Sequence, residues 1–77
     1  MRVLIVEDEA KMAALLLDGL RDHGLAAEIC SRGDEALLKL QAGGFDAAVL
    51  DIMLPGLSGY QVLRELRALR VWTPVLM

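Results

Sequence analysis

The chain has 77 residues, 56% of them hydrophobic and 25% charged, and its formal net charge is −3 at pH 7. This length allows one small domain at most. The acidic balance argues against nucleic-acid binding by this segment, which would need a basic surface, and no apolar run approaches the roughly 18 residues of a membrane span. A single cysteine, Cys30, cannot form an internal disulfide. From the single cysteine we expect a cytoplasmic protein, and from the lack of a long apolar run we expect one that does not bind membranes.

The first predicted elements are a buried strand and a helix with acids between them. Residues Met1–Val6 are apolar and rich in branched side chains, which indicates a buried strand. The acids Glu7–Glu9 follow it. A helical pattern then runs from Ala10 to about His23, and Gly24 is well placed to end the helix. The side chains expected on its buried stripe are Met12, Leu15, Leu16, Gly19 and Leu20.

A weaker strand and a second helix come next. Leu25–Cys30 is predicted to be a strand near the edge of the sheet. Ser31, followed three residues later by Asp34, suggests an N-cap, and the helix is expected to continue to about Gln41. Its buried side chains should be Ala36, Leu37 and Leu40.

The third strand and third helix follow the same scheme. Ala47–Leu50 is apolar on both faces and is followed by Asp51. Ser58 and Gln61 form a capping-box pattern at the start of a helix that is expected to extend to about Arg70. Its buried side chains should be Val62, Leu63, Leu66 and Leu69.

Pro74–Met77 resembles the start of a fourth strand, so strands and helices alternate along the whole chain. Such alternation predicts an α/β fold, in which a parallel sheet is connected by right-handed crossovers. We expect the flavodoxin-like strand order 2-1-3-4.

Two of the predicted strands are followed by acids. In open α/β sheets, ligands bind beyond the carboxyl ends of the strands, where the strand order reverses. In the expected order this point lies between the first and third strands, so Asp8 and Asp51 should face each other there. Neighbouring carboxylates repel unless a cation separates them, and Mg²⁺ suits one or two carboxylates with water and phosphate.

These acids also have simpler interpretations. An acid just before a helix can serve only to favour the helix dipole, and an aspartate after a strand is often a turn residue. The two acids together, on neighbouring strands and with no basic residue nearby in the sequence, favour the metal site.

Three segments carry a resemblance to a known family. They are Arg2–Glu9 (RVLIVEDE), Gly33–Leu37 (GDEAL) and Ala47–Gly59, which contains LDIMLPG followed by Ser58 and Gly59. The sequence resembles the receiver domain of two-component response regulators over its whole length, and its details are most similar to the OmpR/PhoB class of transcription regulators.

The resemblance implies a role for each acid. Asp51 would accept a phosphoryl group from a sensor histidine kinase and form an aspartyl phosphate, a known reaction of carboxylate nucleophiles. Asp8 would bind Mg²⁺ directly, Glu7 would act through water or from behind the direct ligands, and Met53 would offer its backbone carbonyl. The chain would be a signalling module and not an enzyme.

The resemblance also reveals departures. The family places a Ser or Thr after strand four, and a Lys and an aromatic residue on strand five, but this chain ends at Met77. We therefore expect a partial receiver domain without an effector domain, whose DNA binding would reside in a missing output domain. The apolar Val75–Met77 edge would then favour a homodimer.

Three alternatives remain. The first is a truncated fragment that does not switch and serves only as an interaction or dimerisation module. The second is a phosphatase of the haloacid dehalogenase type, which requires an acid where Met53 stands. The third is a flavin-binding protein, but no hydroxyl- and glycine-rich loop follows the first strand.

Overall fold

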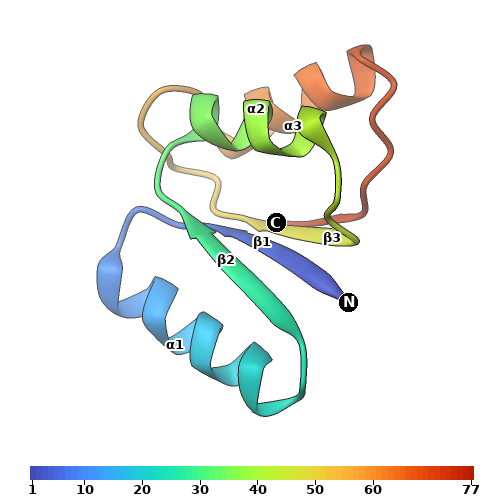
Figure 1. Ribbon diagram of the computed structural model, residues 1–77. Helices are drawn as coiled ribbons and strands as arrows, with labels where there is room; N and C mark the ends of the chain where they lie inside the picture. Colours follow the sequence, from blue (N-terminus) through green and yellow to red (C-terminus); the bar gives the residue numbers. More distant parts are fainter.

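Four parallel strands form one sheet with helices on both of its faces (Figure 1). The computed structural model describes all 77 residues. In chain order the elements are β1 (Arg2–Val6), α1 (Ala10–Asp22), β2 (Ala26–Cys30), α2 (Gly33–Ala42), β3 (Ala47–Leu50), α3 (Gly59–Ala68) and β4 (Val75–Leu76). The strand order is β2-β1-β3-β4 and every pair is parallel, which confirms the predicted fold.

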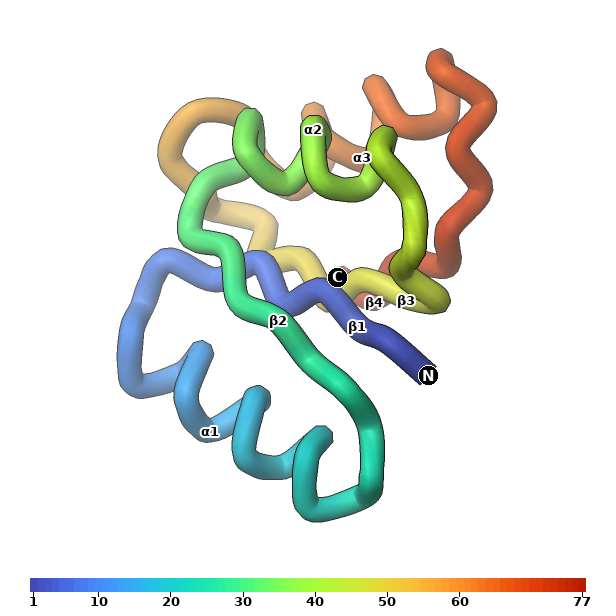
Figure 2. The backbone as a smooth tube through the Cα atoms, in the orientation of Figure 1, coloured from blue at the N-terminus to red at the C-terminus, as the bar shows by residue number.

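The helices divide between the two faces of the sheet. Figure 2 shows the backbone passing through α1 on one side, and through α2 and α3 on the other. This three-layer arrangement explains why β1 is apolar at every position: Val3–Val6 are all buried, because alternate side chains of a strand point to opposite faces. None of the three helices combines the length and apolarity needed to cross a membrane.

The main core lies between the sheet and the pair α2 and α3. Leu4 and Val6 point to this side, and they pack with apolar side chains from the other strands and from both helices. Removing such side chains from water is the main favourable contribution to folding. The buried members of this cluster are Leu4, Val6, Cys30, Ala36, Leu40, Ala48, Leu50, Val62 and Leu66.

Helix α3 begins with the predicted capping box. Ser58 Oγ accepts a hydrogen bond from Gln61 N at 3.2 Å, and Gln61 Oε1 accepts one from Ser58 N at 2.8 Å. The helix ends at Ala68, two residues before the predicted limit, because Arg70 adopts a left-handed conformation with φ of 60°. Leu69 is consequently exposed and not buried as predicted.

The buried face of α1 differs from the prediction. Met12, Leu15 and Gly19 were expected inside, but Met12 and Leu15 are 43% and 68% exposed and Gly19 is exposed as well. Ala13 is buried instead, and Leu16, Leu17 and Leu20 share its side of the helix. The three consecutive leucines, Leu15 to Leu17, fit either of two possible buried faces of α1 equally well. The small Ala13 side chain allows the helix to lie close to the sheet.

The start of α2 also corrects a prediction. Ser31 is not the N-cap: the helix begins at Gly33, Arg32 occupies the N-cap position, and no side chain caps it. The free Gly33 N–H instead donates to the Pro55 carbonyl at 3.0 Å. The tertiary contact therefore replaces the local cap that the sequence pattern suggested. The other boundaries differ from the predicted ones by a residue or two.

Candidate metal centre

The candidate site lies at the carboxyl ends of β1 and β3. Val6 pairs with Leu50 in the parallel register, so the next residues, Glu7 and Asp51, leave the two strands at the same level. The ladder continues one residue further, because Asp51 N donates to the Val6 carbonyl at 3.0 Å. Glu7 N donates to the Cys30 carbonyl at 3.0 Å. The backbone of both acids is therefore fixed by the sheet.

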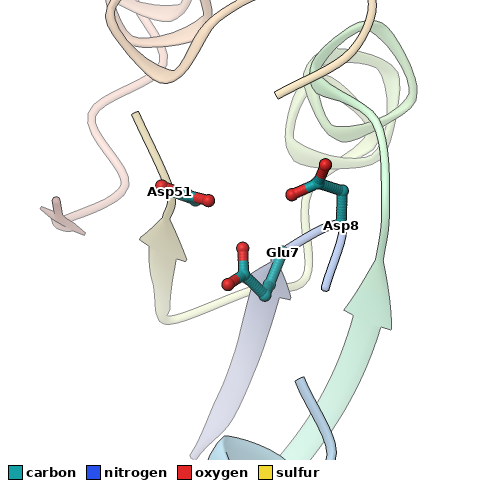
Figure 3. Close-up of side chains that lie close together, drawn as sticks. All are labelled: Glu7, Asp8 and Asp51. Atoms are coloured by element: carbon teal, nitrogen blue, oxygen red, sulfur yellow. The ribbon is translucent and has the colours of Figure 1, made fainter. Parts of the chain in front are cut away.

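Three carboxylates converge at this edge. One side-chain oxygen from each of Glu7, Asp8 and Asp51 lies within 4.8 Å of the other two, and Figure 3 shows the three groups directed toward a common space. Glu7 and Asp51 are half-buried and Asp8 is exposed. The predicted approach of Asp8 to Asp51 is thus confirmed, and Glu7 lies as close to the shared space as they do.

None of the three acids is neutralised by a basic side chain. The ion pairs of the chain join Arg2 and Lys39 to Glu28, and Arg32 to Asp34. The acids do not cap α1 either, because the residue at its N-cap is Glu9, whose side chain forms no capping hydrogen bond. Asp51 Oδ1 accepts a hydrogen bond from Met53 N, as a turn residue does, but neither an ion pair nor a helix cap accounts for the convergence of the three acids.

Glu7 shows the electrostatic consequence of this arrangement most clearly. Its Oε2 atom is buried and has no hydrogen-bond partner. Burial, together with the neighbouring carboxyl groups of Asp51 and Asp8, raises the pKa of Glu7 to about 7 from the usual 4.5. A buried polar atom ordinarily has a partner, and a cation held by the three carboxylates would provide one.

The donor set fits a hard divalent cation. All three groups offer carboxylate oxygens, which Mg²⁺ and Ca²⁺ prefer, and Mg²⁺ binds to few protein groups while it retains several waters. A hollow of about 530 Å³, which Asp8 lines, leaves room for such waters. Its lining residues are Asp8, Ile52, Met53, Leu54, Pro55 and Ser58.

The loop from residue 52 to 58 forms one wall of this hollow. Met53 N donates to Asp51 Oδ1 at 3.4 Å, which holds the loop backbone next to the carboxylate. Met53 is 80% exposed, and its backbone N–H is the group that contacts Asp51. Its role as a carbonyl ligand remains a prediction.

Gly59 anchors the end of this loop. Its N–H donates to the Ile52 carbonyl at 2.8 Å, and a Cβ atom at this position would overlap the Asp51 carbonyl oxygen. The start of α2 also contacts the loop, through Arg32, Gly33 and Asp34. This contact leaves no signal in the sequence, because it joins segments that are separated by most of α2 and the whole of β3.

Comparisons with known proteins find relatives along nearly the whole chain. Residues 3–77 match the family model described as "Response regulator receiver domain". The chain is 49% identical over 76 residues to the transcriptional regulatory protein TcrA of Mycobacterium tuberculosis, which covers 99% of this chain and 30% of that protein. It is 45% identical over 75 residues to the sensory transduction protein RegX3 of Mycolicibacterium smegmatis, which covers 97% of this chain and 32% of that protein. The chain thus spans about a third of the length of these relatives.

Solved structures show the same fold. The receiver domain of the Francisella response regulator 1452 superimposes with a TM-score of 0.93 and 31% identity, over 96% of this chain and 61% of that one. The Thermotoga maritima response regulator TrrA, solved in complex with Mg²⁺ and BeF, superimposes with a TM-score of 0.84 and 38% identity. The match covers 90% of this chain and 60% of that one. The structure of TrrA in complex with the histidine kinase ThkA superimposes with a TM-score of 0.80 and 39% identity. The match covers 87% of this chain and 58% of that one.

Proposed function

The chain belongs to the response regulator receiver domain family, and from this membership we propose that it is a phosphoacceptor whose Asp51 is phosphorylated in a Mg²⁺-dependent reaction. The observation that carries the proposal is the convergence of Glu7, Asp8 and Asp51 at one edge of the sheet, with an oxygen of Glu7 buried and unpartnered. Without a cation, burial and the repulsion among these carboxylates raise the pKa of Glu7 to about 7, and a bound cation would relieve that repulsion.

Each residue of the site has a proposed role in binding the ion. Asp8 and Asp51 provide direct carboxylate ligands for the ion, Met53 contributes its backbone carbonyl, and Glu7 contributes through water or from behind the other ligands. Bound Mg²⁺ would supply positive charge that reduces the repulsion between these acids and an incoming phosphoryl group. The half-buried Asp51 is held by the sheet at one end and by Met53 N at the other, so its carboxylate is fixed beside those of Glu7 and Asp8.

The proposed reaction transfers one phosphoryl group. A carboxylate oxygen of Asp51 attacks phosphorus, an O–P bond forms, and the P–N bond to a phosphohistidine breaks. The leaving imidazole takes up a proton from solvent. The chain therefore acts as a stoichiometric acceptor and not as an enzyme that turns over a free substrate.

The partner that supplies the phosphoryl group is a sensor histidine kinase. Support comes from the solved complex of TrrA with the kinase ThkA. TcrA is a transcriptional regulatory protein of which this chain spans 30%, and we propose that a separate output segment carries any DNA binding. We assign the protein to the cytoplasm, where such kinases present their phosphohistidine.

A second copy of the chain is the proposed partner for the β4 edge. β4 pairs with β3 on one side only, and Leu76 is 68% exposed. A hollow of about 310 Å³ lies beside it, and nine of its ten lining residues are hydrophobic, among them Val3, Leu20 and Val75. An apolar edge of this kind favours pairing with another chain. Sedimentation should show a dimer, and a monomer at high micromolar concentration would contradict it.

Binding of Mg²⁺ tests the assigned ligands. Titration of the ¹⁵N-labelled chain with Mg²⁺ should shift the backbone amide signals of residues 7, 8, 51 and 53. Asp8→Asn and Asp51→Asn should each weaken binding by at least about tenfold, the range seen when a metal site loses a supporting group. Unchanged affinity in both variants would show that the ion binds elsewhere.

A further inference from the structure

The middle of the β3–α3 loop rests on the first residues of α2. Gly33 N donates to the Pro55 carbonyl at 3.0 Å. Gly33 is buried, and a Cβ atom added there would overlap the Leu57 carbonyl oxygen and lie 2.7 Å from its carbon. Such an approach is closer than any side chain tolerates, so only glycine allows this packing.

A second contact lies one residue to either side of Gly33. Arg32 Nε donates to Asp34 Oδ1 at 3.1 Å, and Arg32 Nη2 donates to Asp34 Oδ2 at 3.2 Å. Hydrogen bonding to Arg32 also lowers the pKa of Asp34 below its usual value. The paired groups cover Gly56, whose φ is +79° and whose added Cβ would lie 2.6 Å from Asp34 Oδ1.

These contacts act on the loop that borders the metal centre. The loop is anchored at its far end, where the Gly59 N–H bonds to Ile52 and the Ser58 capping box begins α3. At its near end, Met53 N bonds to Asp51 Oδ1. Between the two anchors, the contacts of Pro55, Gly56 and Leu57 with α2 fix the path of the backbone.

We propose that Gly33 and the Arg32–Asp34 pair are positioning residues that set the Mg²⁺ affinity of the site through the β3–α3 loop. The inference rests on the proposed function and adds to it a group of residues that touch neither the ion nor the phosphoryl group. Displacing the loop moves the Met53 backbone away from Asp51, so the ligand geometry changes although all three acids remain in place.

Gly33→Ala is the direct test, because the added methyl must push Leu57 outward. The variant should bind Mg²⁺ about tenfold more weakly, the usual effect of losing an outer support of a metal site, and its amide shifts should change at residues 52–58. Gly43→Ala is the matched control. It lies at the other end of α2, has a left-handed φ of +86°, and has nothing within 4 Å of an added Cβ. It should lose stability and keep the parent's Mg²⁺ affinity.

Asp34→Ala keeps the test informative if Gly33→Ala does not fold, because it removes an exposed group and adds none. It should weaken Mg²⁺ binding about two- to threefold, in line with an exposed ion pair. Asp34→Asn retains an acceptor for Arg32 and should restore most of the loss.

The outcomes separate the two proposals. If the parent binds Mg²⁺ at the three acids but Gly33→Ala and Asp34→Ala bind it equally well, the positioning role is wrong and the proposed function stands. If the folded parent does not bind Mg²⁺ at these acids, both proposals fail. If Gly43→Ala weakens binding as much as Gly33→Ala, the effect reflects general stability and the positioning role is also wrong.

Discussion

Glu7 and Asp51 follow paired positions on neighbouring strands, and their carboxyl groups share one small space in which Glu7 Oε2 has no hydrogen-bond partner. The sheet therefore holds two acids close together that would separate if they were free to move. This arrangement lowers the stability of the metal-free fold and prepares a cation site.

The stability of the metal-free protein should fall as the pH rises through the range in which Glu7 titrates. Its folded-state pKa of about 7 lies above the ordinary value of 4.5, so the folded protein binds this proton more tightly than the unfolded chain. The resulting stabilisation is fully present below pH 4.5 and is lost as the pH approaches and passes 7, by about 2–3 kcal/mol. Urea unfolding in the presence of a chelator at several pH values measures it.

The matched variant for this measurement is Glu7→Gln, which keeps the shape of the side chain and does not titrate. The difference in unfolding free energy between parent and variant should change steadily between pH 5 and 7. A difference that is constant over this range would show that Glu7 titrates normally in the folded protein.

Mg²⁺ binding should depend on pH through the same group. The nearby positive charge of the ion favours the ionised form of Glu7, so the affinity of the parent should increase with pH up to about 8 and then level off. In Glu7→Gln the affinity should be lower and nearly independent of pH in this range. Calorimetry in two buffers of different ionisation enthalpy would detect the released proton, and equal heats in both buffers would contradict the coupling.

Asp51→Asn should stabilise the metal-free protein. The amide removes one charge from the cluster and retains an oxygen that can accept the bond from Met53 N. We expect a gain of about 1 kcal/mol, or a rise of about 4–8 °C in the Tm of a domain of this size. Thermal unfolding in chelator tests this. An equal or lower Tm would mean that repulsion at the site is negligible.

The capping box of α3 allows a prediction that can be tested without a bound ion. Ser58→Ala removes the oxygen that accepts from Gln61 N and should destabilise the fold by about 1 kcal/mol. Ser31→Ala is the control, because Ser31 is exposed and does not cap α2, so its unfolding free energy should match the parent's. Urea unfolding distinguishes the two, and equal losses would show that the assigned caps are wrong.

The sheet and its acidic edge could be predicted because their signals are local and repeated. Each strand is a short apolar run, each helix follows within a few residues, and Asp8 and Asp51 stand directly after strands that the alternation places side by side. The capping box of Ser58 and Gln61 was equally readable, since both partners lie within one helical turn.

The errors arise where tertiary contacts outweigh local preference. The stripe of α1 was misassigned because Leu15, Leu16 and Leu17 fit two phases, and only contact with the sheet selects the phase that buries Ala13. The Ser31 cap was wrong because the Pro55 carbonyl takes the Gly33 N–H. Such a partner, distant in sequence, leaves no periodic signal.

The central claim is that Asp51 accepts a phosphoryl group when Mg²⁺ is bound, and mass spectrometry tests it directly. The chain is incubated with acetyl phosphate and Mg²⁺, and any acyl phosphate is then reduced with borohydride, which converts the modified aspartate to homoserine. We predict one phosphoryl group per chain, a homoserine at position 51 alone, and no modification in Asp51→Asn or in the presence of a chelator. A phosphoryl group retained in Asp51→Asn, or an unmodified parent at saturating Mg²⁺, would contradict the account.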